Sequence, residues 1–145
     1  MFTKSIYNFP WFVKKVFYEH NISKLKLDIN KTQTNILMFI NENSNKSMSE
    51  ISLMTGLEKS SFTRSIDSLV KNGFIVRNFS ENDRRIIQLS LTAKGIRAAR
   101  FIKNDFGLYL NSLVSHFSEE EKKEFFESLA VTSKYIDKIL EGKKR

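Results

Sequence analysis

Apolar residues recur at helical spacing near the beginning of the chain and again before residue 41. The first set lies at positions i, i+3, i+4, i+7 and i+8, which is one face of a helix. It consists of Phe9, Phe12, Val13, Val16 and Phe17, and we expect a few loose residues before it. A second apolar set at 36–40 follows the polar stretch 30–33 and stops at the Asn- and Ser-rich run 41–47. It predicts a shorter helix that ends in a loop.

The centre of the chain carries start and stop signals for two short helices. Ser47 and Glu50 have the spacing of a capping box, in which the serine hydroxyl accepts from a backbone N–H and the glutamate reaches back to the cap residue. The helix that follows is interrupted at Gly56. A second helical pattern begins near Glu58 and runs to Gly73, where glycine is the expected stop. Two short helices joined by a tight turn with glycine predict a helix-turn-helix.

After residue 73 the apolar period changes from helical to alternating. Ile87, Leu89 and Leu91 alternate with polar residues, and residues 74–79 form a β-branched and aromatic run just before them. The residues between, 80–85, are polar and turn-forming. The segment therefore predicts a β-hairpin with a charged tip, and a hairpin directly after a helix-turn-helix is a wing.

From residue 92 the helical period returns. A long helix through residue 117 is followed by a second capping box, at Ser118 and Glu121, and by a last helix. The apolar face of that last helix contains Phe125, Leu129, Thr132, Ile136 and Leu140. The predicted fold class is therefore mainly α with a small β wing, in a single domain that spans residues 1–145.

The composition narrows the class of function. The 145 residues fit one ordinary domain, and the net charge of +8 favours a polyanionic partner. Because the chain has no cysteine and its five glycines form no phosphate loop, we expect neither an enzyme nor a cofactor. It has no long apolar stretch and no signal peptide, so we expect a soluble cytoplasmic protein.

The second helix of the predicted helix-turn-helix has two different faces. On a helical wheel with about 100° per residue, the inward side holds Phe62, Ile66, Leu69, Val70 and Gly73. The opposite side is polar and holds Ser60, Arg64, Asp67, Ser68 and Lys71, with Ser61 and Ser65 at its flanks. Small hydroxyl side chains allow close approach to a major groove, where Arg64 can bind guanine O6 and N7 or clamp a phosphate. The alternative is an ordinary solvated helix face.

Arginines gather on the predicted wing. Arg84 and Arg85 lie at its tip beside Asp83, and Arg77 lies on the other strand. Arginine on a thin hairpin can enter a narrow minor groove, where the negative potential is enhanced. The alternative is a solvated turn in which Asp83 pairs with an arginine and contributes little.

Five segments form a recognisable series along this region. They are Lys59-Ser60-Ser61-Phe62-Thr63-Arg64, Asp67-Ser68-Leu69, Gly73-Phe74-Ile75-Val76-Arg77, Asp83-Arg84-Arg85 and Leu91-Thr92-Ala93-Lys94-Gly95. The Asp-x-Arg followed by Leu-Thr-x-x-Gly is the specific part, and Thr32-Gln33 also fits. From about residue 31 to residue 95 the chain resembles the winged helix of MarR-type bacterial transcription regulators.

The resemblance implies a homodimer that binds double-stranded DNA at a roughly palindromic operator. The residues that match the groove-facing part of the family's recognition helix are Ser60, Ser61, Thr63, Arg64 and Ser68. Arg85 matches the wing-tip arginine, Asp83 the acidic residue that orients the tip, and Arg77 a basic residue at the start of the wing. Arg84 occupies a position that varies in type across the family.

Dimerisation is expected through residues 1–30 and 96–145, which flank the DNA-binding lobe 31–95. The apolar residues of these flanks would be a liability on a monomer. They include Phe2, Tyr7, Phe9, Trp11, Phe12, Phe17, Phe117, Phe125, Phe126, Ile136 and Leu140. Two linked lobes read half-sites roughly 34–36 Å apart and gain affinity through effective concentration.

The resemblance also implies a repressor whose DNA affinity is changed by a small aromatic or phenolic effector. The candidate pocket walls are Phe12, Val16, His20, Phe39 and Phe101, and the alternative for each is plain core. His20 and His116 are too far apart in the sequence to form a metal-ligand motif, so no metal is expected. The competing function is a protein-interaction module in which the polar helix face meets a partner protein instead of DNA.

Overall fold

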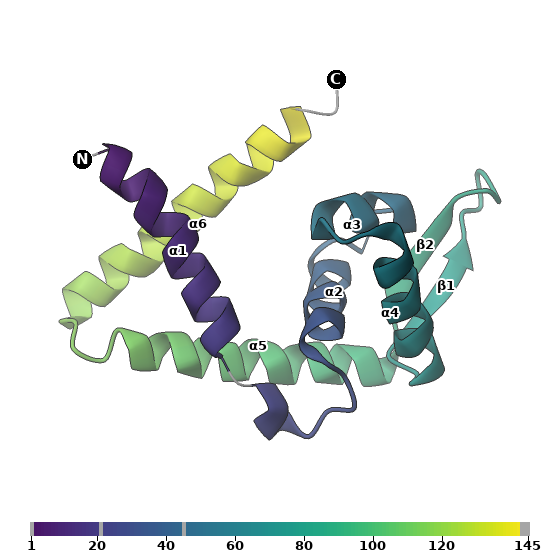
Figure 1. The fold of residues 1–145 in the computed structure, drawn as a ribbon, viewed down its shortest axis with the longest axis horizontal. Helices are drawn as coiled ribbons and strands as arrows, with labels where there is room; N and C mark the ends of the chain where they lie inside the picture. Colours follow the sequence, from purple (N-terminus) through teal and green to yellow (C-terminus); the bar gives the residue numbers. More distant parts are fainter. Residues whose placement is uncertain (1, 21, 45, 143–145) are drawn as a thin grey trace. The chain divides into compact units, whose positions relative to one another are not determined.

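The structure, a computed structural model, describes residues 2–20, 22–44 and 46–142. The side chains of residues 2, 3, 17, 18, 22, 23 and 140–142 lie outside this description, and so do the expected apolar contributions of Phe2, Phe17 and Leu140. The described residues form six α-helices, one 3-10 turn and a two-stranded antiparallel sheet (Figure 1), which confirms the mainly α fold with a small β wing. In chain order the elements are α1 (Phe2–Glu19), η1 (Ile22–Leu25), α2 (Lys31–Glu42), α3 (Met48–Thr55), α4 (Lys59–Lys71), β1 (Ile75–Phe79), β2 (Ile87–Leu91), α5 (Ala93–Leu113) and α6 (Glu119–Gly142).

Side-chain caps fix the start of α3 and of α6. The Ser47 hydroxyl accepts from the Glu50 N–H at 3.2 Å, and the Glu50 carboxylate accepts from the Ser47 N–H at 2.8 Å, so the predicted capping box is confirmed. The box at Ser118 and Glu121 is confirmed in the same way, with distances of 3.2 and 2.7 Å. Gly56 ends α3 in the left-handed region, with a φ of 64°.

Three helix boundaries differ from those expected, and one of them is the end of α5, which lies at Leu113 instead of residue 117. α1 already begins at Phe2, without a loose segment before its apolar stripe, and it holds Pro10 in its interior. α2 begins at Lys31, so the polar stretch 30–33 is its cap and first turn. The reason is a third capping box, in which the Asn30 amide oxygen accepts from the Gln33 N–H at 2.9 Å and the Gln33 amide oxygen accepts from the Asn30 N–H at 2.8 Å.

The inner face of α4 lies at the centre of the core. Phe62, Ile66 and Leu69 are at most 2% exposed, which confirms the inward stripe. Val70 is half-buried, whereas Gly73 is exposed because the helix has already ended and Gly73 takes a φ of 74°. The buried residues packed with this stripe come from α2, α3, both strands and α5, and are Ile36, Leu37, Ile40, Ile51, Phe74, Ile75, Leu89, Ala98 and Ile102. Since each large apolar side chain contributes about 1.5–3 kcal/mol on burial, the stripe fixes the rotation of α4 about its axis.

The wing is the predicted hairpin. β1 and β2 pair from Ile75↔Leu91 to Phe79↔Ile87, and the Ser80 N–H donates to the Ile86 carbonyl at 2.9 Å beyond the last pair. Its base is buried in the core and its far end projects away from α3 and α4 (Figure 1). A bridge between Ser47 and Gln88 joins the wing to the cap of α3. The helix-turn-helix and the wing are thus one packed unit.

α5 begins in close contact with the base of the wing. The Thr92 N–H donates to the Phe74 carbonyl at 3.0 Å, and the Thr92 hydroxyl donates to the Gly73 carbonyl at 2.6 Å. Gly95 lies against the same Phe74 carbonyl, where a side chain would overlap the oxygen. The Leu-Thr-x-x-Gly segment is therefore explained by backbone contact between α5 and the start of β1.

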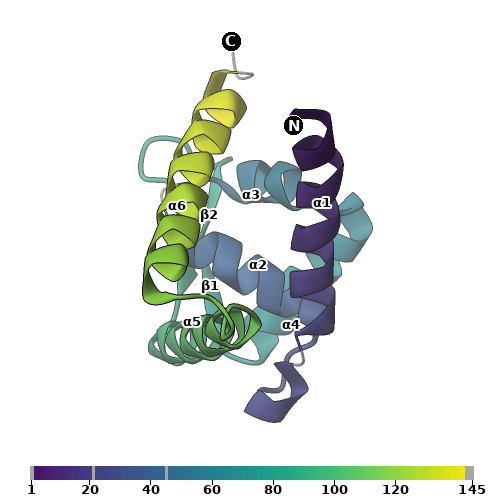
Figure 2. The ribbon, with the colours of Figure 1, turned by 90° about the vertical axis from the view of Figure 1, so that its left-hand side faces the viewer.

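The chain divides within α5 into two compact units, Met1–Gly107 and Leu108–Arg145. Ala98 and Ile102 belong to the core of the first unit, so the beginning of the 96–145 segment, expected to serve dimerisation, also supports the winged lobe. Figure 2 views α5 end-on. In the second unit Phe117 meets Phe125 edge to face, with ring centroids 6.0 Å apart. Among the described residues, none of the helices has the length and apolarity needed to cross a membrane.

Replacing Gly95 by alanine should destabilise the protein. The added methyl group meets backbone atoms of Phe74, which cannot move aside as a flexible side chain would, so we expect a loss of about 1–3 kcal/mol. Urea denaturation measures it. Gly107→Ala is the matched control, because it lies in the same helix and its added methyl group would point into open space among the described residues. It should be neutral or add up to about 1 kcal/mol. Equal effects of the two substitutions would contradict the close-contact explanation.

Candidate nucleic-acid interface

The polar face of α4 carries the residues that the sequence singled out on the recognition helix. Ser60 and Arg64 are exposed, and Ser61, Thr63 and Ser68 are half-buried at the flanks. Arg64 forms no ion pair with a carboxylate among residues 2–20, 22–44 and 46–142. The guanidinium is thus held out on a rigid helix with its donors available.

The hydroxyl groups of this face are not equivalent. The Thr63 hydroxyl donates to the Lys59 carbonyl at 2.9 Å, and the Ser60 hydroxyl donates to the Glu58 carboxylate at 2.5 Å. Each therefore offers only acceptor lone pairs to a ligand. The Ser68 hydroxyl is different, since it accepts from the Gln33 side-chain amide at 2.9 Å and keeps its own proton to donate. The sequence alone does not distinguish the hydrogen-bonding capacity of these three hydroxyl groups.

Gln33 contacts the polar face of α4 and was not among the predicted site residues. Its amide oxygen caps α2, and its amide nitrogen donates to Ser68 on α4. One turn further along α4, the Asn72 amide donates to the Asp28 carbonyl at 3.3 Å. The first turn of α2 and the segment just before it therefore each hold the C-terminal half of α4 at one point. The Asn-x-x-Gln spacing could have indicated the cap, but nothing in the sequence indicated the partner on α4.

Glu58 is the N-cap of α4 and a second residue missed by the sequence prediction. Its carboxylate accepts from the Ser60 N–H at 3.3 Å as well as from the Ser60 hydroxyl. The hydrogen bond from the Ser60 side chain lowers the pKa of Glu58 below its ordinary value, with smaller contributions from the Ser60 backbone and Arg64. The carboxylate and Arg64 face one open hollow, lined by Glu58, Lys59, Ser60, Thr63 and Arg64.

Arg77 lies at the start of the wing but points to the recognition helix. Its guanidinium donates to the Asp67 carboxylate at 2.5 Å, and its side chain is only 32% exposed. Asp67 is on the polar face of α4, so this ion pair fastens β1 to α4. Lys94 contacts the C-terminal end of α4, donating to the Asn72 carbonyl at 2.7 Å. The arginine expected to contact DNA thus forms an ion pair within the protein.

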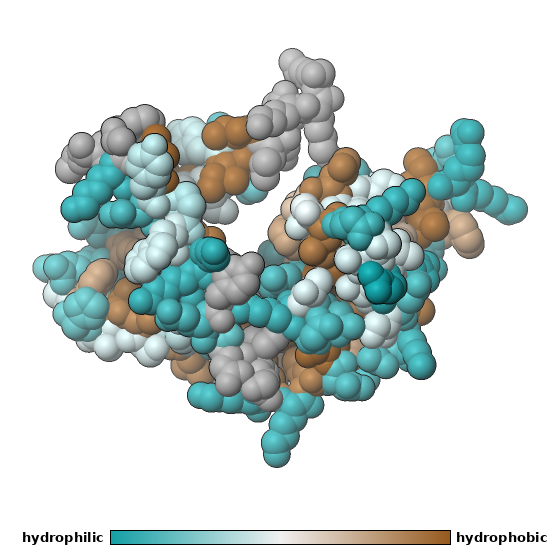
Figure 3. All heavy atoms as spheres, in the orientation of Figure 1, coloured by the Kyte–Doolittle hydropathy of each residue, from teal (hydrophilic) through white to brown (hydrophobic). Residues whose placement is uncertain are grey.

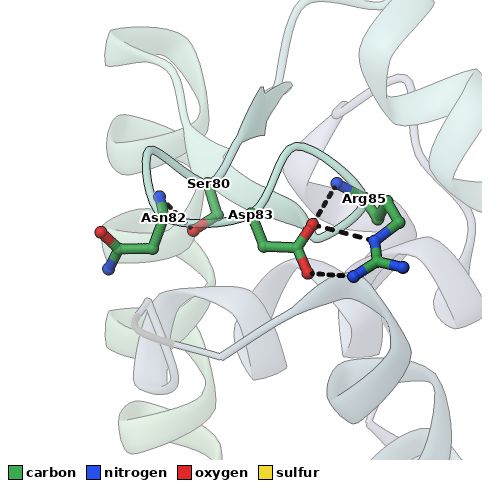
Figure 4. Close-up of polar contacts among 4 residues, drawn as sticks. All are labelled: Ser80, Asn82, Asp83 and Arg85. Atoms are coloured by element: carbon green, nitrogen blue, oxygen red, sulfur yellow. Dashed lines mark hydrogen bonds and ion pairs between the residues drawn. The ribbon is translucent and has the colours of Figure 1, made fainter.

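At the wing tip, Asp83 holds Arg85 in a defined position (Figure 4). The Asp83 carboxylate accepts from the Arg85 N–H at 2.9 Å and from its guanidinium at 3.2 and 3.3 Å. These hydrogen bonds, with that from the side chain first, lower the pKa of Asp83. The Arg85 side chain is 92% exposed, Arg84 is exposed too, and the tip is hydrophilic on the face seen in Figure 3. An ordered and exposed cation is suited to a narrow groove.

The five expected effector-pocket residues lie in different surroundings. Val16 is buried, Phe39 packs on the core, and Phe101 is half exposed. The Nε2 atom of His20 lies 2.7 Å from the Asp105 carboxylate, and the His20 ring meets Phe106 edge to face. Phe12 lines a hollow on α1 together with Lys4, Ser5, Asn8 and Phe9, none of which was expected. Among the described residues there is no group of three or more His, Asp or Glu that could hold a metal ion.

Comparison with known proteins gives a consistent result. Residues 27–86 match the model of the MarR family. The chain is 31% identical over 113 residues to the uncharacterized HTH-type transcriptional regulator YfiV of Bacillus subtilis, covering 78% of this chain and 71% of that protein. A MarR transcriptional regulator from Methanosarcina mazei has a similar structure, with a TM-score of 0.70, 22% identity, and coverage of 95% and 98%. FabT of Streptococcus pneumoniae, solved in complex with DNA, gives a TM-score of 0.62, 24% identity, and coverage of 95% and 94%. At these identities the structures establish the fold alone.

Two substitutions of Gln33 distinguish the contribution of its cap hydrogen bond from that of its hydrogen bond to Ser68. Gln33→Ala removes both the cap and the bond to Ser68, and should destabilise the protein by about 0.5–2 kcal/mol. Gln33→Glu keeps the cap acceptor at a helix N-terminus, where a negative charge is favoured, and forces the Ser68 hydroxyl to donate. It should unfold at nearly the wild-type urea concentration. If the two variants were equally unstable, the cap would not be the main contribution of Gln33.

The pH dependence of the wing tip follows from the lowered pKa of Asp83. A carboxylate with a depressed pKa keeps its interaction at neutral pH and loses it as the pH falls through the folded pKa. Carboxyl carbon-13 NMR should therefore give a pKa below the ordinary 3.8. Arg85→Ala should return the pKa toward that value, because it removes the guanidinium that donates to Asp83. Arg84→Ala removes the neighbouring arginine and is the control, which should leave the pKa lowered. An unchanged pKa in Arg85→Ala would contradict the tether.

Proposed function

Because the chain belongs to the MarR family of transcription regulators, we propose that it is a cytoplasmic, homodimeric repressor that binds a palindromic operator in double-stranded DNA. The observation that carries this proposal is the exposed guanidinium of Arg64 on the polar face of α4, beside a wing whose Arg85 is ordered and almost fully exposed. A regulator of this kind needs one cation for the major groove and another for the minor groove.

The interface residues divide into two kinds of contact. Arg64 forks onto guanine O6 and N7 in the major groove, and Ser60, Ser61 and Thr63 lie on the same helix within reach of base edges. Ser68 donates its hydroxyl proton to a phosphate oxygen. Arg85 enters the adjacent minor groove, with Asp83 fixing its direction, and Arg84 and Arg77 add positive charge along the wing.

Large apolar side chains on α1 and α6 support the homodimer. Tyr7 and Trp11 are 74% and 62% exposed, and Tyr135, Ile136 and Ile139 on α6 are 41–60% exposed. Exposed apolar residues in such number call for a partner surface, and a second copy of the chain supplies one. Two lobes joined in this way read two half-sites about one helical turn apart, which requires a palindromic operator.

A small aromatic or phenolic effector releases the operator in this proposal. The candidate walls remain Phe12, Val16, His20, Phe39 and Phe101. The hollow on α1 that contains Phe12 also contains Lys4, so an aromatic ring and a cation lie together, as an aromatic acid requires. Binding changes DNA affinity only as far as the effector prefers one arrangement of the lobes over the other.

Arg64→Ala tests the proposal against a protein-interaction module. Loss of a forked base contact should weaken operator binding by about 1–3 kcal/mol, or roughly 5- to 150-fold, and leave the dimer intact. The measurement is a mobility shift with the DNA that flanks the gene, at two salt concentrations and with random competitor. Sedimentation gives the oligomeric state.

Arg100→Ala is the matched control, because it removes the same charge from an exposed position on α5. It should leave operator affinity unchanged. Equal affinity of wild type and Arg64→Ala, or wild-type binding without preference over random DNA, would favour the interaction module.

A further inference from the structure

The N-cap of the recognition helix is an unusual residue. Ser, Thr, Asp and Asn are strongly preferred at this position because their short side chains reach the first free N–H groups. Here the cap is Glu58, and its longer side chain folds back to accept from both the N–H and the hydroxyl of Ser60. The side chain is exposed and lies on the hollow that also holds Arg64. A carboxylate therefore stands at the edge of a surface that is expected to face a polyanion.

The position of Glu58 changes what the first turn of α4 can bind. A helix N-terminus normally offers free N–H groups and a positive partial charge, which together attract phosphate. In this helix the Ser60 N–H and the Ser60 proton are both directed at the Glu58 carboxylate. The Thr63 hydroxyl donates inward, to the Lys59 carbonyl. The side chains of Glu58, Ser60 and Thr63 thus present acceptors and a negative charge, which repel a phosphate oxygen.

The same groups are complementary to base amino groups. In the major groove, cytosine N4 and adenine N6 are donors, whereas phosphate oxygens are acceptors without a proton. From these contacts we infer that Glu58 is a specificity-determining residue of the DNA interface, whose carboxylate keeps phosphates away from the first turn of α4 and admits base amino groups there. The inference rests on the proposed DNA-binding function.

In this role Glu58 increases the preference of the recognition helix for particular base sequences and lowers its affinity for DNA of any sequence. Specificity is a difference between two affinities, and it increases when the wrong partner is repelled. Lys59 and Arg64, on the same hollow, still attract DNA as a whole. Glu58 is ionised at neutral pH, as an ordinary glutamate is, and the hydrogen bond from Ser60 lowers its pKa further. It therefore reduces sequence-independent binding, which depends on phosphate contacts alone.

Binding to random-sequence duplex DNA tests the inference without knowledge of the operator. Glu58→Gln keeps the length and an acceptor oxygen but removes the charge, and Glu58→Ser installs a preferred neutral N-cap. The control is Glu124→Gln, which makes the same change of net charge at an exposed position on α6. Fluorescence anisotropy between about 50 and 200 mM salt gives the affinity and its salt dependence, and thermal unfolding checks that each variant is folded.

Both Glu58 variants should bind random duplex roughly three- to tenfold more tightly than wild type, with a salt slope that is steeper by about one unit. Glu124→Gln should bind as wild type does. Selection from a random DNA library should enrich a defined sequence motif with wild type, and a motif with less sequence preference with Glu58→Gln.

Three results would overturn the inference. The first is an unchanged or weaker affinity of both folded Glu58 variants for random duplex. The second is an equal gain in Glu124→Gln, which would assign the effect to net charge. The third is wild type that binds no DNA at all, which would refute the proposed function as well. The first two arise only when wild type binds DNA, so the two failures are distinguishable.

Discussion

Burial of one apolar stripe on α4 is the constraint on which the rest of the molecule depends. Phe62, Ile66 and Leu69 are almost completely buried among residues of α2, α3, the strands and α5. Rotating α4 would expose all three, at a cost of several kcal/mol. The stripe therefore decides which side chains face outward, and Arg64 is among them. The interface is in this sense a consequence of core packing.

Polar side-chain contacts hold the parts of α4 whose position the core does not determine. Gln33 and the Asp28 carbonyl hold the C-terminal half of α4, Asp67 ties it to Arg77 of the wing, and Glu58 closes its first turn. Most of these contacts are exposed and contribute little stability one by one. Each contact determines instead whether a hydroxyl or guanidinium can donate a hydrogen bond to a ligand or already donates it within the protein.

The two ends of the chain and the winged lobe have different chemistry. The lobe buries a large apolar core, although Leu53 and Phe79 remain exposed, whereas α1 and α6 leave several aromatic and branched side chains exposed. Within the lobe, exposed arginines stand on the recognition helix and at the wing tip, where Asp83 orders Arg85 without removing it from solvent. This difference supports the proposed division of labour, in which the lobe binds DNA and the ends of the chain self-associate.

The sequence by itself determined the elements and the polarity of their faces. Caps such as Ser47 with Glu50, the stops at Gly56 and Gly73, and the change from helical to alternating period are local signals, since they act within a few residues. The first turn of α2 was misjudged because polar residues can begin a helix as well as precede it. The sequence could not assign partners across the fold. That Arg77 pairs with Asp67, that Gln33 reaches Ser68, and that Gly95 lies on the Phe74 carbonyl depend on how separate elements pack. Only the tertiary structure decided these contacts, because they join residues far apart in the chain whose approach is set by the shared core.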